Sequence, residues 1–280
     1  NALDGHLIPG LEPLGVPREL KGTSVPFKFN DLQSFEKALE QLGDNIAAVV
    51  MEPMRSQEPE NDFLNKIKNR CQQVGAVFVV DEITSGMRYG FPGAMARLNI
   101  DPDMVVYAKA ISNGIPFATV IGREEIMTAA DKSFISSSYW TDGIGTAAAL
   151  ATLHKMESLD IHQVVWQRGI QFQKALSELA LLYPACKILV AGMPVSPSFT
   201  FQLGAYSAVA KSYYIRKMTE KGFLVSGIYY LMYTHEDQHL LALLEALNSV
   251  LKDLEQLIIN DQLQLEPINK VSNQGFARLT

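Results

Sequence analysis

The chain has 280 residues, enough for one large or two ordinary domains with a sizeable buried core. Hydrophobic residues make up 48% of the sequence and charged residues 19%, the balance of an ordinary globular protein, which argues against wholesale disorder. The formal net charge is −6 and no block of basic residues is present, so a nucleic-acid partner is not expected.

Cysteine usage and hydropathy narrow the class of protein further. Cys71 and Cys186 lie far apart and match no metal-ligand spacing, so we expect neither a zinc site nor a disulfide framework. No apolar stretch approaches the roughly 20 residues that cross a bilayer, and residues 1–10 lack the apolar run of a signal peptide. These features predict a cytoplasmic protein with no metal centre and no membrane partner.

Helical and strand-like segments alternate through the first half of the chain. A loop rich in proline and glycine over residues 1–28 precedes an apolar pattern at helical spacing, which Asn30-Asp31 caps and Gly43 ends. Short continuous apolar runs follow, and such runs indicate strands buried on both faces. The predicted segments are a helix at 32–42, a strand at 46–51, a helix at 62–73 and strands at 76–80, 104–107 and 117–121.

This alternation predicts an α/β fold, in which a parallel sheet carries helices on its faces and is joined by right-handed crossovers. Parallel strands end at the same edge of a sheet, and ligands bind beyond that edge. We therefore expect Glu52, Asp81 and the residues after Tyr107 to gather there.

The second half of the chain predicts a smaller α+β domain. A long helix is expected from Gly143, and after a break near Asp160 a second helix continues to about Leu182. The remaining predicted elements are strands at 187–190, 198–202 and 223–225 and an amphipathic helix at about 236–259. The predicted division is a large domain of residues 1–155 and a small domain of residues 156–280.

Asp81 and Lys109 have complementary chemistry. Taken singly, a carboxylate after a strand is commonly a helix cap, and a lysine beside an apolar run is commonly a surface residue. Together they suit pyridoxal phosphate, which needs a lysine amine for a Schiff base and a carboxylate that keeps its ring nitrogen protonated.

The residues around this pair form an ordered motif. They read Val79-Val80-Asp81-Glu82-Ile83-Thr84-Ser85-Gly86-Met87-Arg88, then Pro102-Asp103, then Lys109-Ala110-Ile111-Ser112-Asn113-Gly114-Ile115-Pro116. The motif closely resembles that of the class III aminotransferases, pyridoxal-phosphate enzymes of fold type I, and most of all the glutamate-1-semialdehyde aminomutase group. The resemblance implies a mostly parallel sheet with flanking helices, residues 1–155 being part of the cofactor-binding domain.

The resemblance also implies roles for single residues. Lys109 would bind pyridoxal 5′-phosphate as a Schiff base and then move a proton between substrate and cofactor. Asp81 would pair with the ring nitrogen, and Ile83 would pack on the ring face. Glu52 matches a glutamate near the substrate side, although it could equally be a strand-ending carboxylate fixed by the following proline. Thr84 departs from the glutamine or methionine of many relatives.

Two further residues are implied to act across a dimer. Ser138 falls where the family usually has a threonine that reaches the cofactor phosphate of the neighbouring subunit, and Thr141 is the second candidate for that contact. A shared active site of this kind implies a homodimer. Relatives have on the order of 150 residues ahead of Leu3, which supply the phosphate-binding turn and a ring-stacking aromatic residue, so the N-terminal part of the fold is expected to be missing.

Three hypotheses follow. The first is a pyridoxal-phosphate enzyme, an aminotransferase or a 2,1-aminomutase, that moves an amino group between a small-molecule amine donor and a carbonyl acceptor. The second is a truncated, non-catalytic relative that keeps the fold as a binding or structural module. The third is a cofactor-free lyase that forms a Schiff base through Lys109 alone, which gives Asp81 no role. We favour the first, because the Asp81 and Lys109 pair is intact.

Overall fold

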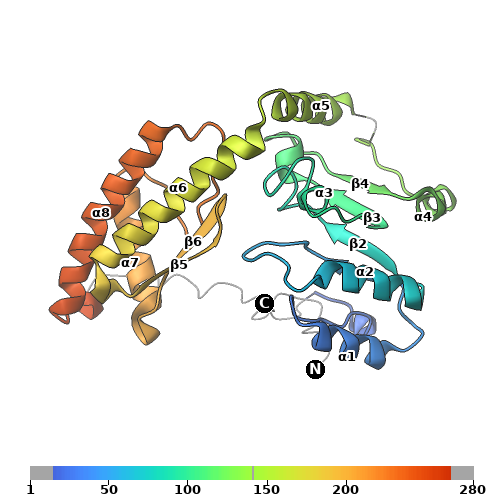
Figure 1. Ribbon diagram of the computed structural model, residues 1–280, viewed down its shortest axis with the longest axis horizontal. Coiled ribbons are helices and arrows are strands. Elements are labelled where there is room, and N and C mark those ends of the chain that lie inside the picture. The colour runs from blue at the N-terminus through green and yellow to red at the C-terminus, as the bar shows by residue number, and fades with distance from the viewer. Residues whose placement is uncertain (1–14, 141, 266–280) are drawn as a thin grey trace. The chain divides into compact units, whose positions relative to one another are not determined.

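The computed structural model describes residues 15–140 and 142–265, which form two compact units. Their described residues divide between Leu159 and Asp160 (Figure 1). The predicted domain boundary at 155/156 falls inside the helix that ends the first unit. No helix within the described residues is long and apolar enough to cross a membrane.

The first unit contains a four-stranded sheet in the order β1-β2-β3-β4. Its strands are β1 (Ala48–Met51), β2 (Val77–Asp81), β3 (Met104–Tyr107) and β4 (Thr119–Gly122). The first three are parallel, as expected, whereas β4 runs antiparallel to β3. The connection before β4 holds only the short 3-10 helix η3 (Lys109–Ile111), and a parallel connection would need a longer crossover.

Two helices pack on one face of this sheet, α1 (Leu32–Leu42) and α2 (Phe63–Val74). Asp31 caps α1, because its carboxylate accepts a 2.9 Å hydrogen bond from the amide of Ser34. Gly43 and Gly75 end the two helices with φ angles of 58° and 71°, a conformation that glycine adopts at little cost. These local signals explain why both helices were predictable.

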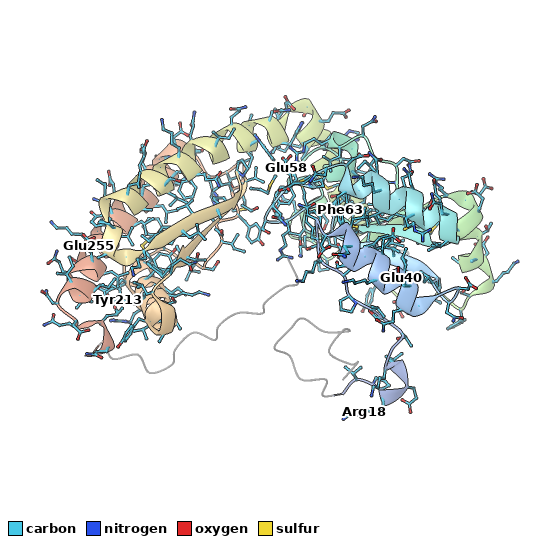
Figure 2. The ribbon with its side chains drawn as sticks, turned by 60° about the horizontal axis from the view of Figure 1, so that its bottom comes forward. Arg18, Glu40, Glu58, Phe63, Tyr213 and Glu255 are labelled. Atoms are coloured by element: carbon cyan, nitrogen blue, oxygen red, sulfur yellow. The ribbon has the colours of Figure 1, made fainter. Side chains whose placement is uncertain are left out.

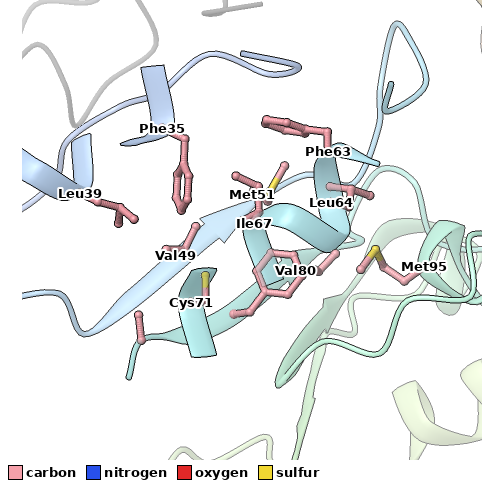
Figure 3. Close-up of a cluster of buried hydrophobic side chains, with 12 residues drawn as sticks. Phe35, Leu39, Val49, Met51, Phe63, Leu64, Ile67, Cys71, Val80 and Met95 are labelled. Atoms are coloured by element: carbon pink, nitrogen blue, oxygen red, sulfur yellow. The ribbon is translucent and has the colours of Figure 1, made fainter. Parts of the chain in front are cut away.

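The core of the first unit lies between these helices and the sheet (Figure 3). It is made of the buried side chains Phe35, Leu39, Val49, Met51, Phe63, Leu64, Ile67, Cys71, Ala76, Phe78, Val80 and Met95. Figure 2 labels two residues of these helices. Phe63, at the start of α2, has a side chain that is only 3% exposed, whereas Glu40 of α1 lies at the surface.

The expectation that the strand over 46–51 is buried on both faces is wrong. In β1 exposed and buried residues alternate, and Val50 is 62% exposed while Val49 and Met51 are buried. The reason is that α1 and α2 cover one face of the sheet only. The open face also carries Val120 of β4, which is 47% exposed.

The remaining elements of the first unit are short, except for the last. They are η2 (Arg18–Leu20), α3 (Ala94–Arg97), α4 (Glu124–Met127), η4 (Thr128–Lys132) and α5 (Gly143–Ser158). Asp142 caps α5 by accepting a hydrogen bond from the amide of Ile144, and the helix ends before Leu159, near the predicted break.

The second unit is an α+β unit, as predicted. Its elements are α6 (Ile161–Leu182), η5 (Pro184–Cys186), β5 (Ile188–Met193), β6 (Ser196–Phe201), η6 (Gly204–Tyr206), α7 (Ser207–Glu220), α8 (Asp237–Ile259) and η7 (Leu263–Leu265). Strands β5 and β6 form an antiparallel hairpin. Aromatic side chains fill the core of this second unit. The hydroxyls of Tyr214 and Tyr229 lie 2.6 Å apart there, and the Phe199 ring contacts both tyrosine rings.

Two sequence-based expectations for this unit are corrected. Residues 223–225 form no strand. The backbone from Gly227 to Tyr229 pairs with β6 instead, through the bonds Phe199 N to Gly227 O and Tyr229 N to Pro197 O. Helix α7 was not predicted, because polar residues interrupt its apolar spacing; it buries Tyr213, labelled in Figure 2, and Met218.

Candidate active site

Polar side chains follow the ends of neighbouring parallel strands, as expected from the topology. Met51 pairs with Val80, so Glu52 and Asp81 stand at the carboxyl ends of β1 and β2. Asp81 pairs in turn with Val106 of β3, and Lys109 follows that strand. The register therefore delivers these groups to one edge of the sheet.

Asp81 is held at the end of β2 by a local hydrogen bond. Its Oδ1 accepts a bond of 2.9 Å from the amide of Ile83, and both residues are half-buried. No ion pair to Asp81 occurs among the described residues, so its carboxylate remains available to a ligand cation.

Lys109 reaches from the end of β3 to the loop that follows β2. Its Nζ donates a hydrogen bond of 2.8 Å to Oγ1 of Thr84, a residue that is 4% exposed. Lys109 itself is exposed, and its φ angle of 52° lies in the left-handed region that side chains such as lysine seldom adopt. This contact joins the predicted lysine to Thr84, which follows Asp81 by three positions in the sequence.

Thr84 also holds a second cationic side chain. Its backbone carbonyl accepts a 2.5 Å hydrogen bond from Nη1 of Arg88. One threonine therefore links two basic side chains, Arg88 through its main chain and Lys109 through its side chain.

Glu82 lies on the opposite side of the strand from Asp81, in the core. It is fully buried, and its two carboxylate oxygens accept hydrogen bonds from the Met95 amide, at 2.8 Å, and from the Ser85 hydroxyl. Burial raises the pKa of the Glu82 carboxyl, and the neighbouring Asp81 charge adds to the rise, whereas hydrogen bonds to the carboxylate oppose it. Glu82 thus fixes the loop between β2 and α3 against the sheet.

The packing around Glu82 leaves no room for a larger residue at Gly93. A Cβ atom there would lie 2.5 Å from Glu82 Oε1 and 3.0 Å from the Tyr107 hydroxyl. Burial also raises the pKa of the Tyr107 phenol to about 12, with a smaller contribution from Glu82. This part of the loop is therefore a rigid support for the residues at the strand ends.

Glu52 forms an ion pair at the end of β1. Its Oε1 lies 2.9 Å from Nη1 of Arg55, and both side chains are partly exposed. The backbone carbonyl of Arg55 accepts a 2.8 Å hydrogen bond from the hydroxyl of Tyr89, which is buried in the loop after β2. That bond ties the loop after β1 to the loop that carries Thr84.

Ser138, the residue predicted to reach the neighbouring subunit's cofactor phosphate, lies at the surface of the single chain. Ser138 is exposed, and among the described residues no hydrogen bond joins it to Lys109 or Asp81. It lies in an aromatic segment, residues 134–140, in which Phe134 is 97%, Tyr139 82% and Trp140 61% exposed. Thr141, the other candidate for the phosphate contact, lies outside the described residues.

Two residues of the site were not among the predicted site residues. Glu82 could have been placed from strand alternation, because it continues the buried positions Phe78 and Val80. Thr84 carried no such signal, since its contact with Lys109 depends on the backbone conformation of both residues. Across the residues that the structure describes, no cluster of three or more metal-ligating side chains occurs.

Comparison with known proteins identifies the class of protein. The sequence profile described as aminotransferase class-III matches residues 16–251. The chain therefore belongs to the class-III aminotransferase family, which confirms the family that its motif resembles.

Its relatives carry names of two kinds. A 3-aminobutyryl-CoA aminotransferase of Cloacimonas acidaminovorans is 28% identical over 255 residues, which are 87% of this chain and 61% of the relative. A glutamate-1-semialdehyde 2,1-aminomutase of Pyrobaculum arsenaticum is 29% identical over 173 residues, which are 59% of this chain and 41% of the relative. The chain thus spans less than two thirds of the length of these curated relatives.

Solved structures share the fold. The FumI protein of Sphingopyxis sp. MTA144, solved with PLP, matches with a TM-score of 0.81 at 20% identity, over 88% of this chain and 61% of the FumI chain. The likeness confirms the predicted fold class, that of the PLP-dependent transaminases, with a mostly parallel sheet and flanking helices.

Proposed function

We propose that this chain carries the lysine and the ring-nitrogen carboxylate of a pyridoxal 5′-phosphate site and acts in amino-group transfer between an amine donor and a carbonyl acceptor. Pyridoxal 5′-phosphate is the cofactor that the family and the PLP-containing neighbour indicate. The observation that carries the proposal is the 2.8 Å bond from Lys109 Nζ to Thr84 Oγ1, which joins the ends of β2 and β3.

The residues at the strand ends fit this cofactor chemically. When bound, pyridoxal phosphate supplies an electron sink for the carbon that bears the amino group. The site offers one primary amine, on Lys109, and one half-buried carboxylate, on Asp81, that is in no ion pair among the described residues. An amine and an acceptor for a protonated ring nitrogen are the two groups that the cofactor requires.

In the proposed site each residue has one task. Lys109 would bind the cofactor and later hold and move the proton at the substrate carbon. Asp81 would accept the hydrogen bond of the ring nitrogen, with Ile83 beside it to pack on the ring face. Glu52, paired with Arg55, would face the substrate side.

We further propose a homodimer with a shared active site. The support is the aromatic segment, whose Phe134, Tyr139 and Trp140 are largely exposed in the single chain, an arrangement typical of surfaces that pack against a partner. Ser138 and Thr141 would then approach the cofactor phosphate of the partner subunit rather than that of their own.

A second function is favoured by a separate observation. The open face of the sheet leaves Val50 62% exposed and Val120 47% exposed, which suits a binding or structural module that keeps the fold without catalysis. Amino-group transfer is our first proposal, because an apolar face gives no reason for the amine and the carboxylate at the strand ends.

Titration with pyridoxal phosphate tests the proposed function. We expect a visible absorption band to form with the wild-type chain and to be lost in Lys109→Ala. The matched control is Lys132→Ala, an exposed lysine of η4, which should leave the band unchanged. A wild-type chain that forms no band, or a Lys109→Ala variant that still forms it, would reject the assignment.

A further inference from the structure

We propose that Thr84 is a positioning residue for Lys109, a role that rests on the proposed function. Its hydroxyl accepts the hydrogen bond of the Lys109 amine and would hold that amine in one direction for reaction with the cofactor aldehyde. A hydroxyl reaches the lysine itself, as the 2.8 Å distance between Nζ and Oγ1 shows.

Thr84 is a well-fixed acceptor. It is 4% exposed, and its own carbonyl oxygen accepts a hydrogen bond from Arg88, so its main chain is held as well as its side chain. Lysine, in contrast, carries its amine on a long flexible stem and is exposed at this position. The fixed Thr84 hydroxyl therefore restricts the flexible Lys109 amine to one direction, and a reaction that needs a defined approach is faster when the amine is held in this way.

The same short segment would hold both ends of the cofactor. Asp81 lies three residues before Thr84, and its Oδ1 is tied to the amide of Ile83. Between them the buried Glu82 anchors the segment to the amide of Met95 at 2.8 Å. The carboxylate for the ring nitrogen and the acceptor for the lysine amine are therefore set at a fixed separation by one turn of backbone.

The backbone of Lys109 supports the same inference. Its φ angle of 52° is costly for a residue with a side chain, and such conformations persist where the surrounding structure holds them. Lys109 begins η3 directly after an extended Ala108, so the strained residue is also the one that carries the reactive amine.

The test is the rate at which the full chain attaches pyridoxal phosphate, followed by absorbance after rapid mixing. In this step the amine nitrogen forms a C=N bond with the aldehyde carbon, and the aldehyde oxygen leaves as water. We expect Thr84→Val, which keeps the shape but removes the acceptor, to slow attachment about tenfold, because the attacking neutral amine loses the one hydrogen bond that orients it. Thr84→Ser should keep the wild-type rate within about twofold, because its hydroxyl remains.

A second readout separates orientation from access. Acetic anhydride acetylates an accessible lysine amine without needing a fixed direction of approach. Peptide mass gives the acetylation of Lys109 relative to that of Lys132. We expect this ratio to change less than about twofold in Thr84→Val. A purely structural role for Thr84 predicts that both reactions change together, and that result would overturn the inference.

The remaining outcomes are distinct. Equal attachment rates in the wild type and Thr84→Val overturn the inference but leave the proposed function intact. If the wild-type chain attaches no cofactor at Lys109, the proposed function itself fails. Should thermal unfolding show that Thr84→Val does not fold, Thr84→Ala takes its place, with the same expected slowing and the same Thr84→Ser rescue.

Discussion

Asp81 and Glu82 are adjacent carboxylates with different surroundings. Asp81 stands half-buried at the strand end, whereas Glu82 is fully buried and accepts hydrogen bonds from the loop before α3. Strand alternation places them on opposite faces of the sheet. One pair of neighbouring acidic residues therefore divides into a group open to a ligand and a group that supports the loop.

Glu82 makes stability depend on pH in a defined direction. Its pKa is raised in the folded chain, so the folded state holds the proton more tightly than the unfolded state. The stability this contributes is fully present below the ordinary glutamate pKa and is lost as the pH rises through the folded value. We expect the free energy of unfolding of wild type, relative to that of Glu82→Gln, to fall as the pH rises above about 4.5. Urea unfolding across this range measures it, and a difference that rises with pH would contradict the assignment.

Gly93 tests how tightly the loop packs on Glu82. A methyl group at this position meets the Glu82 carboxylate at 2.5 Å, so Gly93→Ala should lower the free energy of unfolding by about 1–3 kcal/mol. Gly143→Ala is the matched control, since nothing lies within 4 Å of a Cβ there and the residue begins α5. We expect the control to be neutral or stabilising by up to about 1 kcal/mol. Equal losses in both variants would rule out tight packing at Gly93.

At the scale of elements, helix α2 holds the sheet through its buried stripe. Ile67 is fully buried in the core, so Ile67→Ala should cost about 2–5 kcal/mol of unfolding free energy, from lost burial and the cavity left behind. Gln72→Ala on the exposed face of the same helix should stay within about 0.5 kcal/mol. Chemical denaturation compares the two, and a small loss in Ile67→Ala would show that α2 is not packed as described.

The elements also show what the sequence could predict. Helices α1 and α2 and the strands of the sheet carry clear spacing and cap signals, and they lie where expected. Helix α7 was missed because Ser207, Lys211 and Thr219 interrupt its apolar pattern, and β4 reverses because its connection is short. Asp81 and Lys109 could be singled out because each follows a predicted strand and because pyridoxal phosphate needs a carboxylate and an amine. The family motif contains both residues, and the strand register places both at one edge of the sheet. The Thr84 contact was beyond prediction, because it depends on the positive φ angle of Lys109.

At the scale of the whole molecule, the aromatic segment is the strongest sign of a partner. Its three aromatic side chains are each more than half exposed in the single chain. We expect the wild-type chain to sediment as a dimer, and the double change Phe134→Ser with Trp140→Ser to weaken the dimer by at least about tenfold, as for central interface aromatics. Leu224→Ser, a 93% exposed apolar residue of the second unit, is the control. A monomeric wild type, or a dimer insensitive to the double change, would contradict the proposed interface.

The central claim is that Lys109 and Asp81 hold opposite ends of one pyridoxal phosphate. Borohydride reduction of the loaded chain, followed by intact mass and peptide mapping, tests it most directly. We expect one reduced cofactor per chain, located on Lys109, and roughly tenfold weaker loading in Asp81→Asn, which loses the charged acceptor. A cofactor attached at other lysines, or loading unaffected by Asp81→Asn, would contradict the account.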